Sequence, residues 1–440
     1  MSQRVESWGR YPRSSPARVS LLRDRAAALP TSDEPVLVFG NGRSYGDSCL
    51  LEGGHLLLGR GLDRFLSFDT ETGILRAEAG VLLSEVLELV VPRGWFLPVS
   101  PGTRFVTLGG AVANDVHGKD HHRAGTFGCH VRNFELVRSD GSRRYCSPFD
   151  NPDWFAATIG GMGLTGWLTW VEIQLRPIQG PWIEAEDRPF RSLEEFFELS
   201  EKADMDHEFT VAWVDCAARG NRLGRGIFTS GDFSRDASAV GKVPRAHGRL
   251  SIPVVPPFSL VNQLSLKAFN ALYARKPAKS YRTHYQPFFY PLDSIGEWNR
   301  LYGPKGFLQY QCTFPPENGR EALEDLLDRI SRSGQGSFLA VLKKFGDRPS
   351  PGVLSFPATG FTIALDFPMR GSRTLRLLEA LDRVVEQAGG RLYPAKDARM
   401  SREAFLWSFP QYPDFQHFRD PAITSDFARR VLPPLEPAFS

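Results

Sequence analysis

The most constraining feature of this chain is an apolar run at residues 35–39 that leads straight into a turn with three glycines between residues 40 and 46. Glycine reaches backbone angles closed to other residues and carries no side chain, so such a turn lets a pyrophosphate approach the backbone amides. The glycine spacing nearly matches the Rossmann fingerprint, but residues 48–54 lead into a second extended run, 55–58, and not into an apolar helix. The sequence therefore predicts a phosphate-holding turn between strands; a purely structural tight turn is the alternative.

Two further glycine clusters favour the ligand-binding interpretation. Within residues 101–114, Gly109 and Gly110 are followed by Ala, Val and Ala, which indicates a helix start without bulk, whose free amides and positive dipole end suit a diphosphate. The third cluster, residues 160–166, runs into an expected strand at 167–175. Three such loops predict a long ligand.

The three loops resemble the FAD-binding domain of the vanillyl-alcohol oxidase and para-cresol methylhydroxylase class of flavoproteins, in which the dinucleotide lies extended between two small α+β subdomains. Within that class, residues 115–122, 306–311 and 392–397 resemble the oxidases of polyprenylphosphoryl ribose, the flavoprotein half of an arabinose-forming epimerase. The similarity runs from Trp8 to Arg430, nearly the whole chain. The resemblance implies FAD as cofactor, a lipid-linked sugar as substrate, and an NAD(P)H-dependent short-chain reductase as the partner that completes the epimerisation.

Size, charge and cysteine content exclude several classes of protein. The 440 residues exceed the limit of about 250–300 at which one core stops growing, so two domains are expected. Lys and Arg total 53 against 50 Asp and Glu, which argues against a nucleic-acid partner. Five scattered cysteines disfavour a disulfide framework or a CxxC metal site and suit a cytoplasmic protein. Because no signal peptide and no long apolar segment are recognised, we expect a cytoplasmic location, with peripheral contact at the inner membrane face as an option.

The pattern of elements predicts an α+β fold. Residues 31–178 alternate short strands with glycine turns and include one helix, 82–91, and the Pro/Gly stretch at 176–181 marks a boundary. Beyond it, periodicity predicts helices at 193–203, 321–333 and 373–388 and strands at 209–215, 307–314, 338–343 and 361–367. We therefore expect a two-subdomain FAD-binding domain of the para-cresol methylhydroxylase type, residues 1–180 and 391–440, and an antiparallel-sheet substrate domain, residues 181–390. The return of the tail to the cofactor domain is implied by the resemblance alone.

Residues 243–280 differ from the rest of the chain. They combine three prolines, an apolar run at 260–272 and basic residues such as Lys267 and Lys276. An amphipathic stretch of this kind can lie on a membrane or cover an apolar substrate, whereas a mobile surface insertion is the alternative. The resemblance favours a flexible, lipid-facing insertion, because the substrate of the resembled enzymes carries a polyprenyl tail.

The cofactor is expected to be bound without a covalent link. Several flavoproteins of the resembled class tether FAD through a histidine in the first loop, and Arg43 stands at the matching position, where it cannot form that bond. The residues expected to contact FAD are Gly40, Asn41, Gly42, Arg43, Ser44, Tyr45, Gly46, Asp47, Gly102, Thr107, Leu108, Gly109, Gly110, His117, Gly118, Lys119, Gly166 and Tyr393.

Three histidines lie within six residues, and two of them, His117 and His121, have the i, i+4 spacing of a helical zinc site. Gly118 makes a regular helix doubtful, and no third Cys or carboxylate lies at ligand spacing, so no metal is predicted. A hydrogen-bonded structural role is the simplest interpretation of His121 and His122. The resemblance implies that His117 lies beside the isoalloxazine ring and the substrate.

Lys396 lies in a short polar loop after an expected strand, where a surface lysine is the common case. Oxidation of an alcohol, however, releases a hydroxyl proton and places negative charge on the reduced flavin, and one buried or tuned lysine can assist either task. The resemblance implies an active-site role for Lys396, with Tyr45 and His117 as the other expected catalytic side chains.

Substrate contacts are expected along the strand at 307–314, where Gln309 and Gln311 alternate and so share one face. Two amides on one face suit hydrogen bonds to sugar hydroxyls; a solvated strand face is the alternative. The resemblance implies that Lys343 and Tyr285 face the same pocket. Ala364 stands where the resembled enzymes carry a cysteine, which removes a thiol and predicts weak reaction with thiol-directed inhibitors.

Together these expectations describe an FAD-dependent oxidoreductase that oxidises the C2 hydroxyl of a polyprenylphosphoryl ribose to the keto sugar. One alternative keeps the fold but oxidises a soluble polyol or aldonolactone with oxygen as acceptor. Another is a non-catalytic FAD-binding protein, against which the combination of His117, Lys396 and the glutamine face argues.

Overall fold

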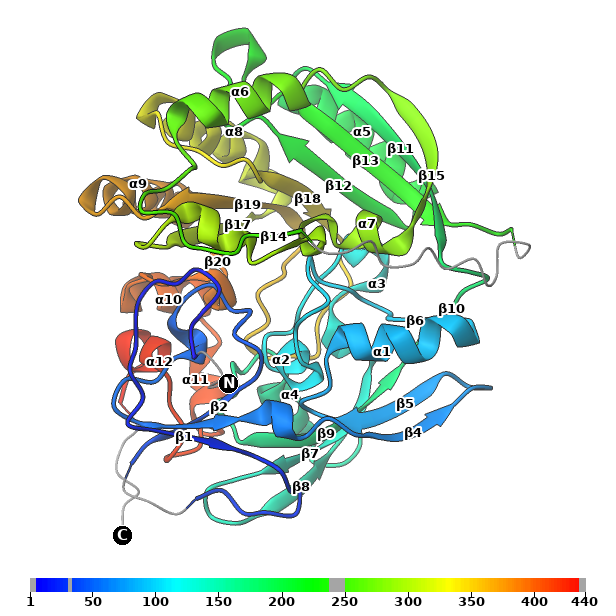
Figure 1. Cartoon of the computed structure of the whole chain (residues 1–440), viewed down its shortest axis with the longest axis vertical. Coiled ribbons are helices and arrows are strands. Elements are labelled where there is room, and N and C mark those ends of the chain that lie inside the picture. Colours follow the sequence, from blue (N-terminus) through cyan, green and yellow to red (C-terminus); the bar gives the residue numbers. More distant parts are fainter. Residues whose placement is uncertain (1–4, 31–33, 237–249, 435–440) are drawn as a thin grey trace.

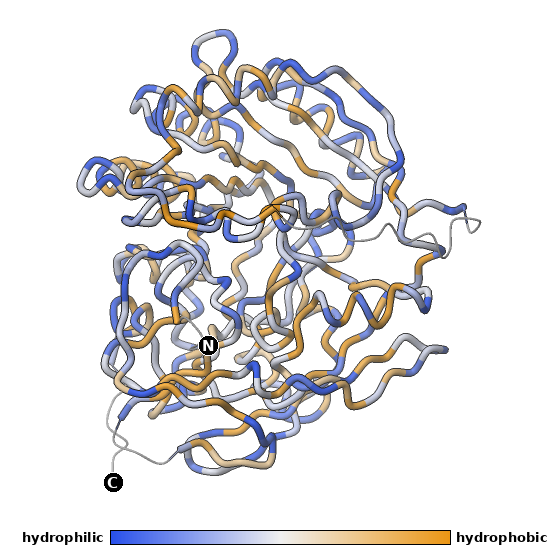
Figure 2. The backbone as a smooth tube through the Cα atoms, viewed as in Figure 1, coloured by the Kyte–Doolittle hydropathy of each residue, from blue (hydrophilic) through white to orange (hydrophobic). Residues whose placement is uncertain are grey.

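The computed structural model describes residues 5–30, 34–236 and 250–434. One large sheet with its helices occupies the upper half of the view in Figure 1, and two smaller sheets with the C-terminal helices occupy the lower half. Apolar segments gather within the sheets and helices, whereas the outer turns are hydrophilic (Figure 2). The mixture of helices and mainly antiparallel sheets confirms the α+β class.

The first small sheet carries the glycine turn at residues 40–46. Its strands, β1 (Arg18–Leu21), β3 (His55–Leu58) and β2 (Val36–Phe39), pair in parallel in the order β1-β3-β2. Only a short 3-10 turn, η1 (Asp47–Cys49), lies between β2 and β3. The predicted strand–turn–strand arrangement is therefore confirmed, and no Rossmann helix follows the turn.

The second small sheet is antiparallel and carries the other two glycine clusters. Its strands, in spatial order, are β4 (Phe65–Asp69), β5 (Ile74–Glu78), β9 (Trp167–Gln174), β7 (Val131–Val137) and β8 (Arg143–Cys146). Helix α1 (Leu83–Val90), as predicted, and the short helix α2 (Leu108–Ala113) share an apolar core with this sheet. Short elements nearby are β6 (Trp95–Phe96), α3 (His121–Ala124), α4 (Pro152–Thr158) and β10 (Arg176–Pro177).

The large sheet has eight strands, all paired antiparallel. In spatial order they are β15 (Lys279–His284), β11 (Trp182–Phe190), β13 (Gly226–Phe233), β12 (Phe209–Val214), β18 (Val341–Phe345), β19 (Gly360–Pro368), β17 (Phe307–Phe314) and β20 (Arg391–Leu392). Strand β18 begins later than the predicted 338, and the carbonyl of Phe338 instead accepts a hydrogen bond from the indole of Trp213.

Three helices cover the outer face of this sheet: α5 (Leu193–Asp206), α8 (Pro316–Ser333) and α9 (Ser372–Gln387). Helix α8 starts five residues before the predicted position 321, since a proline is favourable in a first helical turn. Along β19, Ile363 and Leu365 belong to the core under these helices. Because side chains alternate along a strand, Thr362, Ala364 and Asp366 point to the opposite face, toward the lower half of the molecule.

The chain crosses between the two halves after β20, which still pairs with β17. It passes through the 3-10 turn η9 (Pro394–Lys396) and continues into α10 (Arg402–Ser408), α11 (Tyr412–Gln416) and α12 (Asp426–Val431). Helix α12 packs beside η1, at the start of the cofactor loops. The domain division at residues 180 and 391 stays a prediction.

Candidate active site

A cavity of about 740 Å³ lies between the loops of the small sheets and the inner face of the large sheet. We call its loop side, formed by segments 40–45, 100–114 and 162–168, the cofactor wall. We call its other side the sheet wall, formed by Asp187, Val211, Trp213, Thr229, Tyr281, Gln309, Gln311, Val341, Lys343, Thr362, Ala364 and Asp366. The Tyr393–Lys396 turn closes one end, so one cavity joins all three glycine loops to the polar strand faces.

Short hydrogen bonds hold the loops of the cofactor wall together. The Asn41 amide donates to the carbonyl of Phe105 over 2.7 Å, which ties the first loop to the second. Thr107 caps helix α2, because its hydroxyl accepts a 3.1 Å hydrogen bond from the amide of Gly110. A Cβ at Gly40 would lie 2.7 Å from that same hydroxyl. A glycine is therefore required where the first loop meets the helix start.

The cofactor wall fits a long cofactor such as FAD. A Cβ added at Gly102 or Gly163 would meet no atom within 4 Å, so these positions border open space in the cavity. Gly163 also has φ +74°, a conformation that side-chain-bearing residues rarely adopt. Arg43 lies 4.3 Å from the ring centre of Trp8 and 5.8 Å from that of Phe105, so its guanidinium is stacked in the wall.

Most of the predicted cofactor residues line the cavity, and three do not. Those that do are Gly40, Asn41, Gly42, Arg43, Ser44, Tyr45, Gly102, Thr107, Gly109, Gly110, His117, Gly118, Lys119, Gly166 and Tyr393. Leu108 is instead fully buried in the core under α2. Gly46 packs against the backbone, since a Cβ there would lie 1.6 Å from the carbonyl oxygen of Asp397. Asp47 is not among the residues that line the cavity, and its carboxylate forms an ion pair with Arg430.

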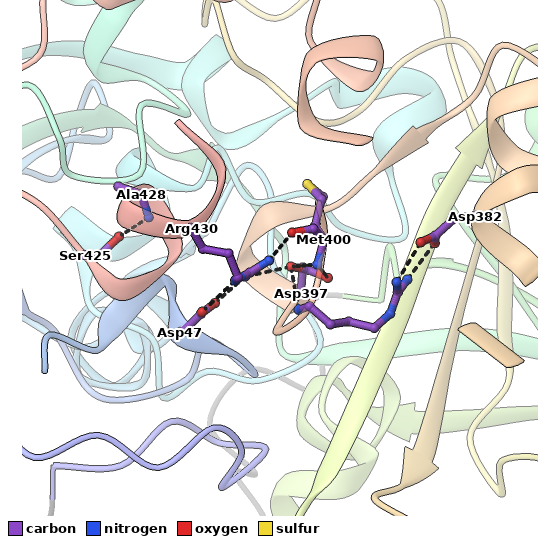
Figure 3. Close-up of polar contacts among 8 residues, drawn as sticks. Asp47, Asp382, Asp397, Met400, Ser425, Ala428 and Arg430 are labelled. Carbon is purple, nitrogen blue, oxygen red and sulfur yellow. Dashed lines mark hydrogen bonds and ion pairs between the residues drawn. The ribbon is translucent and has the colours of Figure 1, made fainter. Parts of the chain in front are cut away.

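A network of charged side chains supports both the first loop and the Lys396 turn (Figure 3). Arg430 of α12 pairs with Asp47 at 2.7 Å and with Asp397 at 3.0 Å. Burial raises the pKa of Asp47, and the Arg430 guanidinium opposes that shift. The Asp397 carboxylate also accepts the amide of Met400. The C-terminal helix therefore fixes the residue that follows Lys396 relative to the cofactor wall.

Lys396 lies at the end of the cavity against Tyr45. Its Nζ is 4.0 Å from the centre of the Tyr45 ring, and the amide of Tyr45 donates to the carbonyl of Ala395 over 3.0 Å. Burial lowers the pKa of the Lys396 ammonium to about 7, and the nearby Asp366 carboxyl opposes the shift. Lys396 can therefore exchange a proton near neutral pH, which is the property required of an acid or base in this pocket.

The two predicted glutamines occupy neighbouring positions on the sheet wall. Gln309 lies opposite Asp366 in the ladder and donates to its Oδ1 over 2.7 Å. Gln311 lies opposite Ala364, and its amide nitrogen is 3.0 Å from Nε2 of His117 and 3.3 Å from the hydroxyl of Thr362. The alternation that predicted a shared face is confirmed, although both amides also have protein partners.

His117 is buried between the two walls. Its ring contacts those of Phe345 and Tyr393, with centroid distances of 4.9 and 5.4 Å. Burial, together with the charge of Lys343, lowers the pKa of His117 well below its usual value, so the imidazole is neutral at pH 7. With Gln311 donating to Nε2, the ring hydrogen is on Nδ1, which has no hydrogen-bond partner among the described residues.

Two further lysines give the cavity a cationic character. The Nζ of Lys119 donates to the carbonyl of Phe288 and lies 4.5 Å from the centre of that ring. The Nζ of Lys343 donates to the carbonyl of Gly118 over 3.3 Å. Burial lowers the pKa of Lys119 to about 7 and that of Lys343 to about 8. A bound anion would stabilise the charged form of both amines.

Tyr285 does not reach the cavity, contrary to the prediction. It lies in α7 (Tyr285–Phe289) and is 4 % exposed. Its ring centre is 5.2 Å from that of Phe96, in the core beneath the sheet edge. Phe288 and Phe289 of the same helix line the cavity instead.

The neighbouring histidines have structural partners. His121 Nδ1 accepts the amide of Gly346 over 3.2 Å, and His122 Nε2 lies 3.0 Å from the carbonyl of His207. Within the part of the chain that the structure describes, no three His, Cys, Asp or Glu side chains are grouped to hold a metal ion.

The sequence reasoning missed several cavity residues. Asp366 and Thr362 share a strand face with Ala364, so the same period-two argument applied to β19 would have found them. Trp8, Trp213 and Tyr281 come from distant segments without a motif, and no local signal points to them. Cys49 also lines the cavity, so the pocket is not free of thiols; burial raises its pKa to about 12, which makes it unreactive.

Comparisons with known proteins agree with this geometry. A family model described as an FAD binding domain matches residues 15–147, which contain the first two glycine loops. Decaprenylphosphoryl-β-D-ribose oxidase of Mycolicibacterium smegmatis is 35 % identical over 98 % of this chain and 97 % of its own length. A Streptomyces coelicolor protein, named only by its position in the mprA 5′ region, is 33 % identical over 80 % of this chain and its whole own length. L-gulonolactone oxidase of Mus musculus is 28 % identical over 37 % of this chain.

Proposed function

This chain belongs to the decaprenylphosphoryl-β-D-ribose oxidase family, and from that premise we propose that it oxidises the C2 hydroxyl of a polyprenylphosphoryl ribose to the keto sugar. FAD is the cofactor, and when bound it supplies the hydride acceptor. The observation that carries the proposal is the single cavity in which bulk-free cofactor loops face a strand surface of amides and lysines. A sugar that also bears a phosphate needs both kinds of partner.

Side chains of the sheet wall, together with Lys119 and Lys396, account for binding and proton transfer. Gln309 and Gln311 present amides to the cavity, which suit hydroxyl groups of a pentose. Lys119 and Lys343 offer ammonium groups to the phosphate. Lys396, whose pKa is lowered to about 7, can take the proton that leaves the hydroxyl as the carbonyl forms.

We also propose that FAD is held without a covalent bond. Arg43 lines the cofactor wall with its guanidinium 4.3 Å from the centre of the Trp8 ring, and an arginine offers no attachment point for the flavin. Acid precipitation should leave the protein colourless and release the flavin into the supernatant. Flavin that stays with the precipitate would contradict this part of the proposal.

The lipid tail has a candidate exit beside helix α6 (Gln263–Tyr273). Residues 243–249 of the predicted insertion lie outside the described residues. In the remainder, Leu250, Val254, Phe258, Leu264 and Leu272 are exposed, and we call this set the apolar edge. Tyr273 and Lys276 at the end of α6, and Ile295 beside Leu250, line the cavity. The apolar edge is thus linked to residues that line the cavity, which supports an exit of the polyprenyl chain on this side.

Basic residues beside the apolar edge, among them Lys267, Arg275 and Lys279, suit an anionic membrane surface. No helix in the described ranges is both long and apolar enough to cross a membrane. We propose peripheral attachment at the cytoplasmic membrane face, where a separate NAD(P)H-dependent short-chain reductase would consume the keto sugar. Co-sedimentation with anionic vesicles should be lost in the double variant Leu264→Ser, Leu272→Ser. Unchanged vesicle binding would show that the apolar edge is not the membrane contact.

Anaerobic mixing with candidate substrates tests the proposed reaction directly. Polyprenylphosphoryl ribose should bleach the flavin absorbance, while sorbitol and an aldonolactone should leave it unchanged. Bleaching by the lactone alone would instead favour a soluble-substrate oxidase, in line with the partial similarity to L-gulonolactone oxidase. Tight FAD binding without bleaching by any of the three would indicate a non-catalytic FAD-binding protein.

A further inference from the structure

Asp366 is a buried carboxylate of the sheet wall with no role in the proposed binding of the substrate. Its side chain is completely shielded from bulk solvent, although it borders the cavity. Oδ1 accepts the amide of Gln309 over 2.7 Å, and the backbone amide of Asp366 donates to the hydroxyl of Ser337 over 3.0 Å. Oδ2 has no hydrogen-bond partner among the described residues. Burial raises the pKa of Asp366 to about 7, and the Gln309 hydrogen bond and the charge of Lys396 oppose that shift. A buried carboxylate with one free oxygen is costly unless a cation lies close.

The available cation is Lys396. Each of the two groups acts electrostatically on the other, and the interaction with Asp366 is the largest that opposes the deprotonation of Lys396. Lys396 borders the cavity above the Tyr45 ring, and Asp366 borders the same cavity from the sheet wall. The two groups therefore face one shared cavity.

We propose that Asp366 is a positioning residue that acts through Lys396, as the buried counter-ion that stabilises the ammonium formed when Lys396 takes the substrate proton. The inference rests on the proposed function. Oxidation of the secondary alcohol removes a hydride, which carries its electron pair to the flavin oxidant, and a proton, which passes from the hydroxyl to the Lys396 amine. The carbonyl is the product, and the Asp366 carboxylate stabilises the new ammonium electrostatically. The arrangement has the logic of a carboxylate behind a general base.

Other titratable groups lie near Asp366 and Lys396 and affect the charge of the two residues. Tyr45 and Tyr302 both interact with Asp366, and burial raises the pKa of each, so they stay neutral. Lys343 of β18 acts on Lys396 and opposes its charge. Neutral His117 lies close enough for the charge of Lys396 to act on it. Asp366 is the carboxylate in this group that favours a charged Lys396.

The chain offers a matched control for this pairing. Asp120, also buried, opposes the deprotonation of Lys343 as Asp366 opposes that of Lys396. In the FAD-loaded protein, lysines can be converted to ¹³C-dimethylamines, which keep their charge, and titrated by NMR, with Lys396→Arg and Lys343→Arg assigning the two signals. Asp366→Asn should lower the titration midpoint of Lys396 by at least about one pH unit and leave that of Lys343 in place. Asp120→Asn should do the reverse.

A reciprocal measurement covers the case in which Asp366→Asn does not fold. In Lys396→Met, the Asp366 carboxyl loses its cation, so the infrared C=O band of a protonated carboxylic acid should persist to higher pH than in the parent protein. Asp366→Asn should also slow flavin reduction about 100-fold, and Asp366→Glu should restore part of the rate. An unchanged Lys396 midpoint in Asp366→Asn, or an unchanged carboxyl band in Lys396→Met, would overturn the inference. Failure of the parent protein to bleach with lipid-linked ribose would contradict the proposed function alone, because neither titration needs substrate.

Discussion

The two walls of the cavity are built on opposite principles. The cofactor wall is rich in glycine, and its glycines either border open space, as at Gly102, or meet another loop, as at Gly40. The sheet wall is made of side chains from seven strands, among them Gln309, Lys343 and Asp366. The cofactor wall provides space for its ligand, so larger side chains at its glycines should block binding. The sheet wall provides hydrogen bonds and charges, so the loss of its polar groups should weaken binding or catalysis.

The largest expected effect comes from the sheet side, at the Tyr393–Lys396 turn. Lys396→Ala should bind FAD normally and slow flavin reduction by about 1000-fold, because the proton acceptor is lost. Stopped-flow absorbance measures the rate, and flavin fluorescence measures FAD affinity. Lys305→Ala, an exposed lysine outside the cavity, is the control. A turnover close to that of the parent protein would reject the role of Lys396.

On the cofactor side, a glycine-to-alanine substitution shows whether a glycine is needed for packing within the protein or for space that the ligand occupies. Gly46→Ala should cost about 3 kcal/mol of folding stability, because its Cβ would overlap the carbonyl oxygen of Asp397. Gly102→Ala should keep the fold and weaken FAD binding, since its methyl group enters the cavity. Denaturant unfolding and FAD titration separate the two outcomes. Equal stability of both variants would show that the close approach at Gly46 is wrong.

The Arg430 network connects the first glycine loop with the Lys396 turn, so its loss should affect both FAD binding and catalysis. Arg430→Met leaves the carboxylates of Asp47 and Asp397 without their cation, which should cost about 3 kcal/mol. Urea unfolding measures the loss. FAD affinity and the flavin reduction rate should both fall, because the first loop and the Lys396 turn lose a shared anchor. An effect on only one of the two would show that the network supports a single wall.

Substrate and cofactor affinity should respond differently to pH. The lowered pKa values of Lys119 and Lys343, about 7 and about 8, mean that both ammonium charges are present below those values and are lost as the pH rises through them. Affinity for the phosphate-bearing substrate should therefore fall about tenfold between pH 6.5 and 9. FAD affinity should change less, because backbone amides do not titrate. Lys343→Met should flatten the substrate curve; a curve as steep as that of the parent would remove Lys343 from the phosphate site.

The smallest effect is expected at Ala364. Ala364→Cys places a thiol on the sheet wall opposite Gln311, and a thiol-directed reagent should label that position. The parent protein should not react in the cavity, because burial raises the pKa of Cys49 to about 12. Flavin reduction should change less than about threefold, since hydride acceptance by the flavin needs no protein nucleophile. Labelling of the parent at Cys49 would contradict this assignment.

The difference between the walls also explains what the sequence could predict. Local patterns were sufficient for the cofactor wall, because glycine clusters such as 40–46 and 160–166 report a backbone requirement at the position where it acts. For the sheet wall, alternation identified Gln309 and Gln311, yet nothing local shows that Lys343 and Asp366 face the same cavity. These side chains lie in one cavity because the order of strands in the sheet places β17, β18 and β19 side by side.

Three of the predicted site residues, Asp47, Leu108 and Tyr285, do not line the cavity. Asp47 and Leu108 lie in the predicted loops, but tertiary partners turn the first toward Arg430 and the second into the core. Tyr285 was placed by resemblance, and the packing of α7 buries it against Phe96. For Asp47 and Tyr285, the side-chain direction depends on partners more than 100 residues away, Arg430 and Phe96, which no local pattern reveals.

A crystal structure of the FAD complex tests the central claim most directly. The account predicts continuous density for one FAD along residues 40–45, 107–110 and 163–166, with no bond to Arg43 and with the flavin end against His117 and Lys396. Density for the flavin ring elsewhere than between the cofactor wall and the sheet wall, or a covalent link to the protein, would contradict it.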